Sequence, residues 1–207
     1  MDDIGEIVLG IPEPVANLQL PDPDLRDFYK YESKRIFWLN DNVENCAEVL
    51  IRLILECNAE DKNVPVEKRV PIKIFINSNG GDVTYMWTII NLIENSKTKV
   101  ITINYCTAYS AAAEILASGH ERYAIPGSHV MVHSGYCGYS GQADQVESMK
   151  KYFDTLSEKT KKHLLSKTKI NPKTYKRKAA IDWFMDENEA LENGIIDKIV
   201  TNLDEIL

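Results

Sequence analysis

"PIKIFINSNGGDVTYMWTIINLIENSKTKVITINYC", residues 71–106, carries the pattern that decides the fold. "PIKIFINS" alternates isoleucines on one side with a phenylalanine on the other, which predicts a strand buried on both faces. "VTYMWTIINLIEN" then places four apolar side chains at helical spacing: Met86, Ile89, Ile90 and Ile93. "KVITINYC" is typical of a second strand. A strand, a helix and a strand in this order predict a βαβ unit with parallel strands and a right-handed crossover.

The segment before this unit continues the alternation. "KRIFWLN" predicts a strand, followed by a helix over about 44–57. We expect the apolar stripe of this helix to be formed by Val49, Leu50, Leu53 and Ile54. A charged loop that contains a proline, "NAEDKNVPVEKRV", then leads back to the βαβ unit. The upstream segment therefore adds one strand and one helix to the predicted fold.

The downstream segment adds further strands and a long helix. A helix begins near Ser110, and two short strands, "RYAIP" and "HVMVH", follow it. A glycine-rich stretch, "GYCGYSGQ", leads into a long helix over about 142–167, and "IIDKIVT" is the last predicted strand. Because strands and helices alternate as βαβαβ, we predict an α/β fold with a largely parallel sheet.

Two shorter helices near the C-terminus carry capping signals. Asn171 precedes a proline at the first position of one helix, an arrangement typical of an N-terminus. Asp186 and Glu189 have the spacing of a capping box, and the helix that they begin is expected to end at Gly194. These signals predict where both helices start.

The composition is that of one folded domain without a nucleic-acid-binding surface. The chain has 207 residues, of which 44% are hydrophobic and 27% are charged, enough for a sizeable core. Its net charge of −7 argues against a nonspecific nucleic-acid binder, which needs a basic face. Residues 1–27 hold four of the eight prolines, so we expect an N-terminal arm there and a single domain over residues 28–207.

The N-terminus and the cysteines indicate a cytoplasmic protein. "MDDIGEIVLG" is acidic and lacks the basic and apolar regions of a signal peptide. The most apolar early stretch, "AEVLIRLILEC", is too short for a membrane span and carries Arg52. The absence of a C-x-x-C spacing favours reduced, partly buried thiols over a disulfide framework or a zinc site. The four cysteines are Cys46, Cys57, Cys106 and Cys137. We therefore expect neither a membrane nor a metal ion as a partner.

Three features fall just beyond the carboxyl ends of predicted strands, where open α/β sheets gather functional groups. "NSNGGDV" follows the first strand of the βαβ unit, Ser110 follows the second, and His133 closes "HVMVH". Acyl transfer needs such a set, because a serine becomes nucleophilic when a histidine takes its proton and a carboxylate orients the imidazole. Adjacent glycines such as Gly80 and Gly81 let backbone N–H groups approach a developing oxyanion.

Each of these residues also has a structural explanation. Ser110 can be the N-cap of the helix that follows it, because a serine hydroxyl accepts a hydrogen bond from the first turn. The Gly80–Gly81 pair can form a plain tight turn, and His133 can be a structural histidine. Asp182, in "AAIDWFMDENEA", is typical of a loop or cap residue when taken alone. "AYSAA" does not match G-x-S-x-G, so the nucleophile elbow of α/β-hydrolases is not indicated. The local sequence leaves both explanations open.

Four motifs, in order, resemble the ClpP family, the proteolytic subunit of ATP-dependent Clp protease. They are "FINSNGGDV", "TAYSAAAEILASG", "PGSHVMVHSGYCGYSGQA" and "IDWFMDENEALENGIIDKI", and the likeness runs over about residues 35–200. The resemblance implies a ClpP/crotonase-like fold of repeated β-β-α units with a largely parallel sheet. It also implies a handle over about 134–167, made of a strand and a long helix.

The resemblance implies a serine peptidase site with no cofactor and no metal ion. Ser110 would be the nucleophile, His133 the general base and Asp182 the carboxylate that orients it. The backbone N–H groups of Gly81 and Ala111 would form the oxyanion hole. Ser110 would then begin a helix and act as the nucleophile at once, since the same free N–H groups serve both purposes.

The resemblance also implies an assembly and partners. Two stacked heptameric rings, a tetradecamer, would enclose a chamber into which a hexameric AAA+ Clp unfoldase threads polypeptide substrates. ATP would be used by that partner and not by this chain. The handle would join the rings, and the backbone of its first part would hold substrate as an added strand. One alternative is a catalytically weak or noncatalytic subunit that assembles with a paralogue. Another is a crotonase-type acyl-CoA enzyme, which shares the fold class but not this triad.

The chain departs from the usual pattern of that family at four positions. Asn79 stands where a proline usually precedes the two glycines, and Ala112 stands where glycine is usual. Glu114 lies one helical turn beyond the serine at a normally apolar position, and if it faced the site it would raise the pKa of the histidine. Ile181 occupies the place of an arginine that commonly joins the ring-to-ring contact. The resemblance therefore does not imply how assembly couples to activity here.

Overall fold

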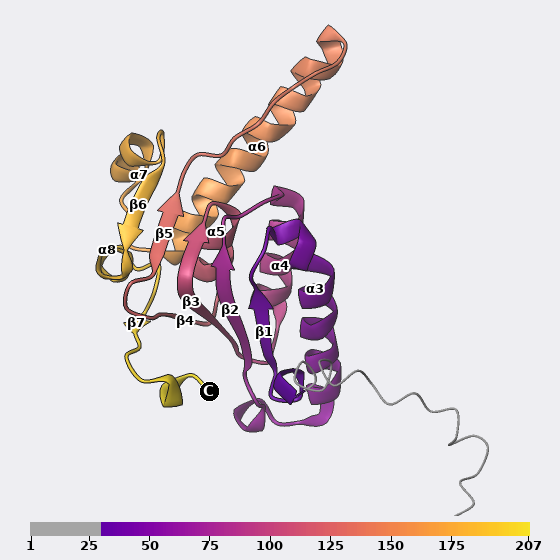
Figure 1. Cartoon of the computed structure of the whole chain (residues 1–207). Helices are drawn as coiled ribbons and strands as arrows, with labels where there is room; N and C mark the ends of the chain where they lie inside the picture. Colours follow the sequence, from indigo (N-terminus) through magenta and orange to yellow (C-terminus); the bar gives the residue numbers. More distant parts are fainter. Residues whose placement is uncertain (1–29) are drawn as a thin grey trace, which may run out of the picture. The chain divides into compact units, whose positions relative to one another are not determined.

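The computed structural model describes residues 30–207 (Figure 1). The chain divides into two units, residues 1–34 and residues 35–207. The predicted N-terminal arm, residues 1–27, lies outside the described residues. All the elements discussed below belong to the second unit. None of the helices in the described part of the chain combines the length and the apolar character that crossing a bilayer requires.

Residues 35–207 form a seven-stranded sheet in the order β1-β2-β3-β4-β7, with β5 paired to β3 and β6 paired to β5. All of these strand pairs are parallel except β5–β6. The strands are β1 (Ile36–Leu39), β2 (Ile72–Ser78), β3 (Val100–Tyr109), β4 (Glu121–Ala124), β5 (His129–Val132), β6 (Trp183–Asp186) and β7 (Lys198–Ile199). The helices are α3 (Val43–Glu60), α4 (Val83–Asn95), α5 (Ala111–Ala117), α6 (Ala143–Lys167), α7 (Pro172–Lys178) and α8 (Glu187–Glu192), with short 3₁₀ helices η1 (Asp61–Asn63), η2 (Val66–Lys68) and η3 (Leu203–Glu205). This arrangement confirms the predicted α/β fold with a largely parallel sheet.

Strand β2, helix α4 and strand β3 form the βαβ unit that residues 71–106 predict. Helix α4 has the predicted bounds, and the Asp82 carboxylate caps it by accepting the N–H groups of Thr84 and Tyr85 at 2.7 and 3.1 Å. Strand β3 runs three residues past its predicted end at Cys106, because its last part pairs with β5 instead of β4. This extension places the residue that follows β3 at the same edge as the end of β5.

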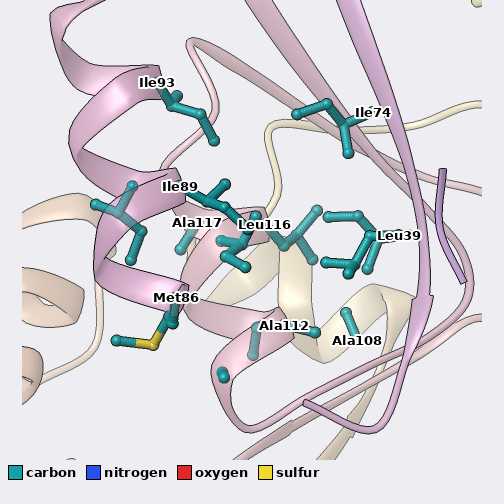
Figure 2. Close-up of a cluster of buried hydrophobic side chains, with 14 of the residues drawn as sticks. Leu39, Ile74, Met86, Ile89, Ile93, Ala108, Ala112, Leu116 and Ala117 are labelled. Carbon is teal, nitrogen blue, oxygen red and sulfur yellow. The ribbon is translucent and has the colours of Figure 1, made fainter. Parts of the chain in front are cut away.

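The core lies between the sheet and helices α3, α4 and α5 (Figure 2). Ile72, Ile74 and Ile76 of β2 are fully buried there, because alternate residues of a strand point to the same side. Helix α5 is buried along its whole length, and its alanines let it approach the sheet closely. Phe75 points to the opposite face, where it packs partly buried against a smaller cluster. The prediction of burial on both faces of this strand therefore holds fully for only one of them.

Helix α3 buries Leu50, Leu53 and Ile54 as predicted, but it leaves Val49 41% exposed. Leu50 lies at the centre of the buried stripe of this helix. Consecutive residues of a helix are separated by about 100° around its axis, so Val49 faces away from the stripe. Its inclusion in the apolar stripe is therefore wrong.

Strand β6 lies in a segment for which the sequence predicts no strand. Its side chains alternate, with Trp183 and Met185 buried and Phe184 and Asp186 exposed, and the strand pairs antiparallel with β5. An alternation of only four residues is too short to indicate a strand by itself. Pairing with a segment distant in the sequence makes it one. Strand β7, in contrast, is shorter than the predicted strand "IIDKIVT".

The handle has the predicted long helix but not the predicted strand. Helix α6 buries only Leu164 and extends away from the sheet (Figure 1). Residues 134–142 are irregular and run beside it, where the rings of Tyr139 and Phe153 lie 5.6 Å apart. A strand needs a neighbour to complete its ladder of backbone hydrogen bonds, and no segment within the described residues pairs with 134–142. The expected strand is therefore wrong for a single chain.

Both predicted N-caps are confirmed, but the capping box predicted for Asp186 and Glu189 is only half formed, because the Glu189 side chain does not accept the Asp186 N–H. The Asn171 side chain accepts the N–H of Lys173 at 2.8 Å at the start of α7. The Asp186 carboxylate accepts the N–H of Glu189 at 2.8 Å at the start of α8. Gly194 follows α8 with φ +69°, a conformation that glycine adopts readily at the end of a helix. The C-terminal helices therefore begin and end where their local sequence predicts.

A buried ion pair joins the start of β1 to the end of α3. Arg35 donates to both carboxylate oxygens of Asp61 at 2.6 and 3.0 Å, and the Thr98 hydroxyl donates to the same carboxylate at 2.7 Å. The side chains of Arg35 and Asp61 are 13% and 6% exposed. The hydrogen bond from Arg35 holds the pKa of Asp61 below its usual value. The carboxylate is therefore charged where it meets the guanidinium.

Asp61→Asn is expected to lower the free energy of unfolding by about 2 kcal/mol, because it removes the buried counter-ion of Arg35 and leaves only the exposed Glu60 carboxylate, 3.1 Å away. In the wild type, the contribution of Asp61 is present above the pKa of an unfolded aspartate, about 4, and is lost as the pH falls through the lower folded pKa. Urea unfolding at neutral pH measures the first effect, and an acid series measures the second. Glu67→Gln, an exposed change in η2, is the control. An equal loss in both variants would contradict the prediction.

Candidate active site

The carboxyl ends of β2, β3 and β5 bring the predicted turns together. These strands are parallel neighbours, since β3 pairs with β2 and also with β5. Gly80 and Gly81 follow β2, Ser110 follows the last residue of β3, and His133 follows the last residue of β5. The residues that the sequence singled out for acyl transfer therefore lie at one edge of the sheet.

Ser110 has a strained backbone conformation, with φ +55° and ψ −122°. Such a conformation costs about 1–3 kcal/mol in a residue with a side chain, and backbone hydrogen bonds on both sides of the residue hold it here. The Ser110 N–H donates to the Met131 carbonyl at 2.8 Å, and the Ser110 carbonyl accepts the Ala113 N–H at 3.0 Å. The Ser110 side chain makes no capping hydrogen bond, and its Oγ lies 2.6 Å from His133 Nε2. The explanation of Ser110 as a side-chain N-cap is therefore wrong.

His133 stands between Ser110 and Asp182. Its Nδ1 lies 3.5 Å from Asp182 Oδ1, an ion-pair distance that is longer than a good hydrogen bond. The side chain of Asp182 is 57% exposed, and that of His133 is 21% exposed. Ile181, the residue before Asp182, is 76% exposed. The structure brings the three predicted side chains together, and the contact between His133 and Asp182 is longer than the contact between Ser110 and His133.

The Gly80–Gly81 turn lies directly against the segment that carries Ser110. A Cβ atom on Gly80 would come within 2.7 Å of the Tyr109 carbonyl oxygen and 3.0 Å of the Ala111 nitrogen. Gly80 and Gly81 have φ values of +101° and +148°, which favour glycine. In the part of the chain that the structure describes, neither Gly81 N–H nor Ala111 N–H donates to a protein acceptor. Both N–H groups can therefore donate to an oxygen bound beside the serine.

The first turn of helix α3 contacts the Gly80–Gly81 turn on the side away from Ser110. The sequence alone did not predict this contact. The Val43 N–H donates to the Gly80 carbonyl at 2.9 Å, and the Asp82 N–H donates to Glu44 Oε2 at 2.9 Å. Helix α3 follows β1, which lies parallel to β2, so its N-terminus reaches the same edge of the sheet. One sequence feature could have indicated Glu44: it is an acidic residue in the first turn of a helix that directly follows a strand.

Glu114 does not face His133. It is buried in α5, and its Oε2 lies 3.5 Å from Nδ1 of His163 on α6. The other ring nitrogen of His163 lies 3.1 Å from Glu94 of α4, and Glu94 also pairs with Lys167 at 2.6 Å. Burial raises the pKa of Glu114, and the neighbouring His163 imidazole opposes this shift. The condition for an effect of Glu114 on His133 is therefore not met, and Glu114 instead joins α5 to the handle helix α6.

The four cysteines are free thiols, as predicted. Cys57 is buried, and burial raises the pKa of its thiol to about 11. Cys46 is half-buried, whereas Cys106 and Cys137 are exposed. The expectation of partly buried thiols therefore holds for two of the four. Disulfides play no part in holding the site residues in place.

A family model described as Clp protease matches residues 26–203. The match covers most of the chain and includes Ser110, His133, Asp182 and the Gly80–Gly81 turn. It agrees with the order of the four sequence motifs and with the mixed α/β fold and mostly parallel sheet. The chain therefore belongs to the Clp protease family, and the candidate site lies within its protease domain.

Proposed function

We propose that this chain is a serine-type endopeptidase subunit that hydrolyses unfolded polypeptides with Ser110, His133 and Asp182. The observation that carries the proposal is the 2.6 Å contact between Ser110 Oγ and His133 Nε2, on a serine whose side chain does not cap its helix. A serine hydroxyl is a weak nucleophile, and a histidine within hydrogen-bond reach activates it. The family match supports the coarser part of the proposal, a ClpP-like peptidase.

In the proposed reaction, His133 Nε2 takes the proton of Ser110 as Oγ attacks the carbonyl carbon of a peptide bond. The carbonyl oxygen becomes an oxyanion, which the N–H groups of Gly81 and Ala111 would stabilise. The imidazolium then gives its proton to the leaving amine, and the C–N bond breaks to leave an acyl ester on the serine. A water molecule then attacks the carbonyl carbon of this ester, and His133 takes a proton from that water. The bond between this carbon and Oγ breaks, the carboxylic acid product leaves, and the imidazolium returns a proton to Oγ. These steps use no metal ion or cofactor.

Asp182 is proposed to accept the Nδ1–H of His133, which keeps the imidazole in its reactive tautomer and stabilises the imidazolium. From 3.5 Å, the carboxylate has to move by about 0.7 Å to reach an ordinary hydrogen-bond distance. It stands next to the exposed Ile181, so a subunit contact at this turn would bring it into position. We therefore propose that assembly completes the row of three side chains.

The proposed assembly is a tetradecamer of two stacked heptameric rings, fed by a hexameric AAA+ Clp unfoldase. The family match and the shape of the handle support it, because α6 extends beyond the sheet with Leu164 as its only buried residue. Handles from opposite rings would cover one another, and the backbone of residues 134–142 would bind substrate as an added strand. The unfoldase would use the ATP, and the particle would work in the cytoplasm.

A fluorophosphonate probe tests this function in the assembled protein. The wild type is expected to be labelled once per chain, on the tryptic peptide that contains Ser110, and Ser110→Ala is expected to stay unlabelled. Ser166→Ala removes an exposed serine of α6 and serves as the matched control, which should be labelled like the wild type. Native mass spectrometry of the same samples establishes the ring state.

A second candidate function is a noncatalytic subunit that assembles with an active paralogue. The loose contact between His133 and Asp182 favours it. A wild-type tetradecamer that takes no label would support this candidate and contradict the peptidase. The crotonase-type acyl-CoA enzyme gains no support, because the family match is to a protease.

A further inference from the structure

We propose that Glu44 is a positioning residue that holds the Gly81 N–H in the oxyanion hole. This inference rests on the proposed peptidase function. Glu44 is the second residue of α3, and its Oε2 accepts the Asp82 N–H at 2.9 Å. It acts through the backbone of the glycine turn, not on the substrate.

The orientation of the Gly81 N–H follows from the planarity of its peptide unit. A trans peptide unit carries its C=O and its N–H on opposite sides, so fixing one direction fixes the other. The unit between Gly80 and Gly81 presents its carbonyl to α3, where the Val43 N–H donates to it at 2.9 Å. The Gly81 N–H therefore points away from the first turn of α3. On its other flank, this turn packs against Ser110 and Ala111.

Two adjacent glycines make this peptide unit easy to rotate. Neither residue has a Cβ atom to restrict its φ and ψ. A half-turn of the unit would exchange its carbonyl and its N–H, and a carbonyl would then face the developing oxyanion and repel it. The Val43 N–H holds the unit at one point, and Glu44 holds the next unit through the Asp82 N–H. Two consecutive hydrogen bonds thus restrain the rotation of the peptide units that the two glycines do not restrict.

The Glu44 carboxylate also fills the space beside Gly81. A Cβ atom on Gly81 would overlap Glu44 Oε2 and come within 2.9 Å of the Val43 nitrogen. A carboxylate suits this place, because a charged acceptor makes a stronger hydrogen bond than a neutral one. The first turn of α3 also favours negative charge through the helix dipole. The glycine and the glutamate therefore fit one another.

Glu44→Ala removes the acceptor, whereas Glu44→Gln keeps one, so the pair tests positioning. We expect Glu44→Ala to lower kcat for a short fluorogenic peptide by about 10- to 100-fold, since losing an oxyanion donor outright costs about 10²- to 10³-fold. Its KM should stay within about 3-fold of the wild type, because substrate binding is not disturbed. Glu44→Gln should keep kcat within about 5-fold of the wild type, because the amide oxygen still accepts. A peptide boronate, which forms a tetrahedral adduct on the serine, should lose affinity for Glu44→Ala in parallel with kcat.

Two controls keep the inference falsifiable. Glu48→Ala changes an exposed glutamate one turn later in α3 and should match the wild type. Glu44→Asp keeps the charge but is one methylene shorter, so it should lose kcat like Glu44→Ala even if the alanine variant folds poorly. Rates are expressed per site counted by complete fluorophosphonate labelling, so that unfolded chains do not mimic a catalytic loss.

The outcomes separate this inference from the function on which it rests. Wild-type kcat in Glu44→Ala, or equal losses in Glu44→Ala and Glu44→Gln, would overturn the positioning role and leave the peptidase intact. A wild-type protein that neither takes the label nor cleaves the peptide would overturn the proposed function, and this inference with it.

Discussion

Replacing Ser110 with alanine is expected to lower kcat/KM for a short fluorogenic peptide by about 10⁵- to 10⁶-fold. The change removes Oγ, which lies 2.6 Å from His133 Nε2, and leaves the histidine with no nucleophile to activate. The fold should survive, because the Ser110 side chain makes no capping hydrogen bond to α5. Its Tm should therefore stay within about 3 °C of the wild-type value. Peptide hydrolysis, thermal unfolding and native mass of the same preparation measure the three quantities.

The double variant Ser110→Ala/His133→Ala distinguishes a catalytic pair from two independent residues. When two residues act as a unit, removing the second costs little once the first is gone. The kcat/KM of the double variant should therefore be within about 3-fold of that of Ser110→Ala. Additive losses would contradict the pairing. So would a Ser110→Ala particle that retains more than about 1% of the wild-type kcat/KM, since no other nucleophile is proposed.

Gly80→Ala is expected to lower kcat/KM by about 10²- to 10³-fold, comparable to the loss of one oxyanion donor. The new Cβ atom would lie 2.7 Å from the Tyr109 carbonyl oxygen, 2.9 Å from Ser110 Cβ and 3.0 Å from the Ala111 nitrogen. Two of these are backbone atoms, which cannot rotate away, so either the glycine turn or the serine has to shift. The φ of +101° adds strain for any residue with a side chain. We expect the free energy of unfolding to fall by about 2 kcal/mol as well.

Gly127→Ala separates the effect of the clash from the effect of the backbone strain. Gly127 also has a positive φ, +81°, but a Cβ atom there would meet nothing within 4 Å. This control should lose about 1 kcal/mol of stability and keep the wild-type kcat/KM. Equal kcat/KM in Gly80→Ala and Gly127→Ala, per labelled site, would show that contact between the turn and the serine does not matter for the reaction.

The βαβ unit was predictable because its signals are local. Alternation in β2 and helical spacing in α4 record which side of each element faces the core, and Asp82 marks the start of the helix. Strand β6 escaped prediction because its four residues become a strand only by pairing with β5. The handle strand was expected from the family resemblance, yet residues 134–142 have no partner for a ladder among the residues described. Prediction therefore succeeded where a segment carries its own signal and failed where a distant neighbour supplies it.

By itself, the sequence determined the α/β class, the parallel sheet and the identity of the candidate residues, including Ser110, His133 and Asp182. Periodicity and strand ends are read along the chain, and the carboxyl ends of parallel strands meet at one edge, which singled out Ser110, His133 and the glycine pair. The role of Asp182 came only from the resemblance to the ClpP family. Only the tertiary structure decided that the Ser110 hydroxyl turns to His133 instead of capping α5, that Glu114 turns away toward α6, and that Glu44 reaches the glycine turn. Each of these depends on the register between strands and on the direction in which a helix leaves the sheet. Such contacts join segments far apart in the chain, and no local pattern records them.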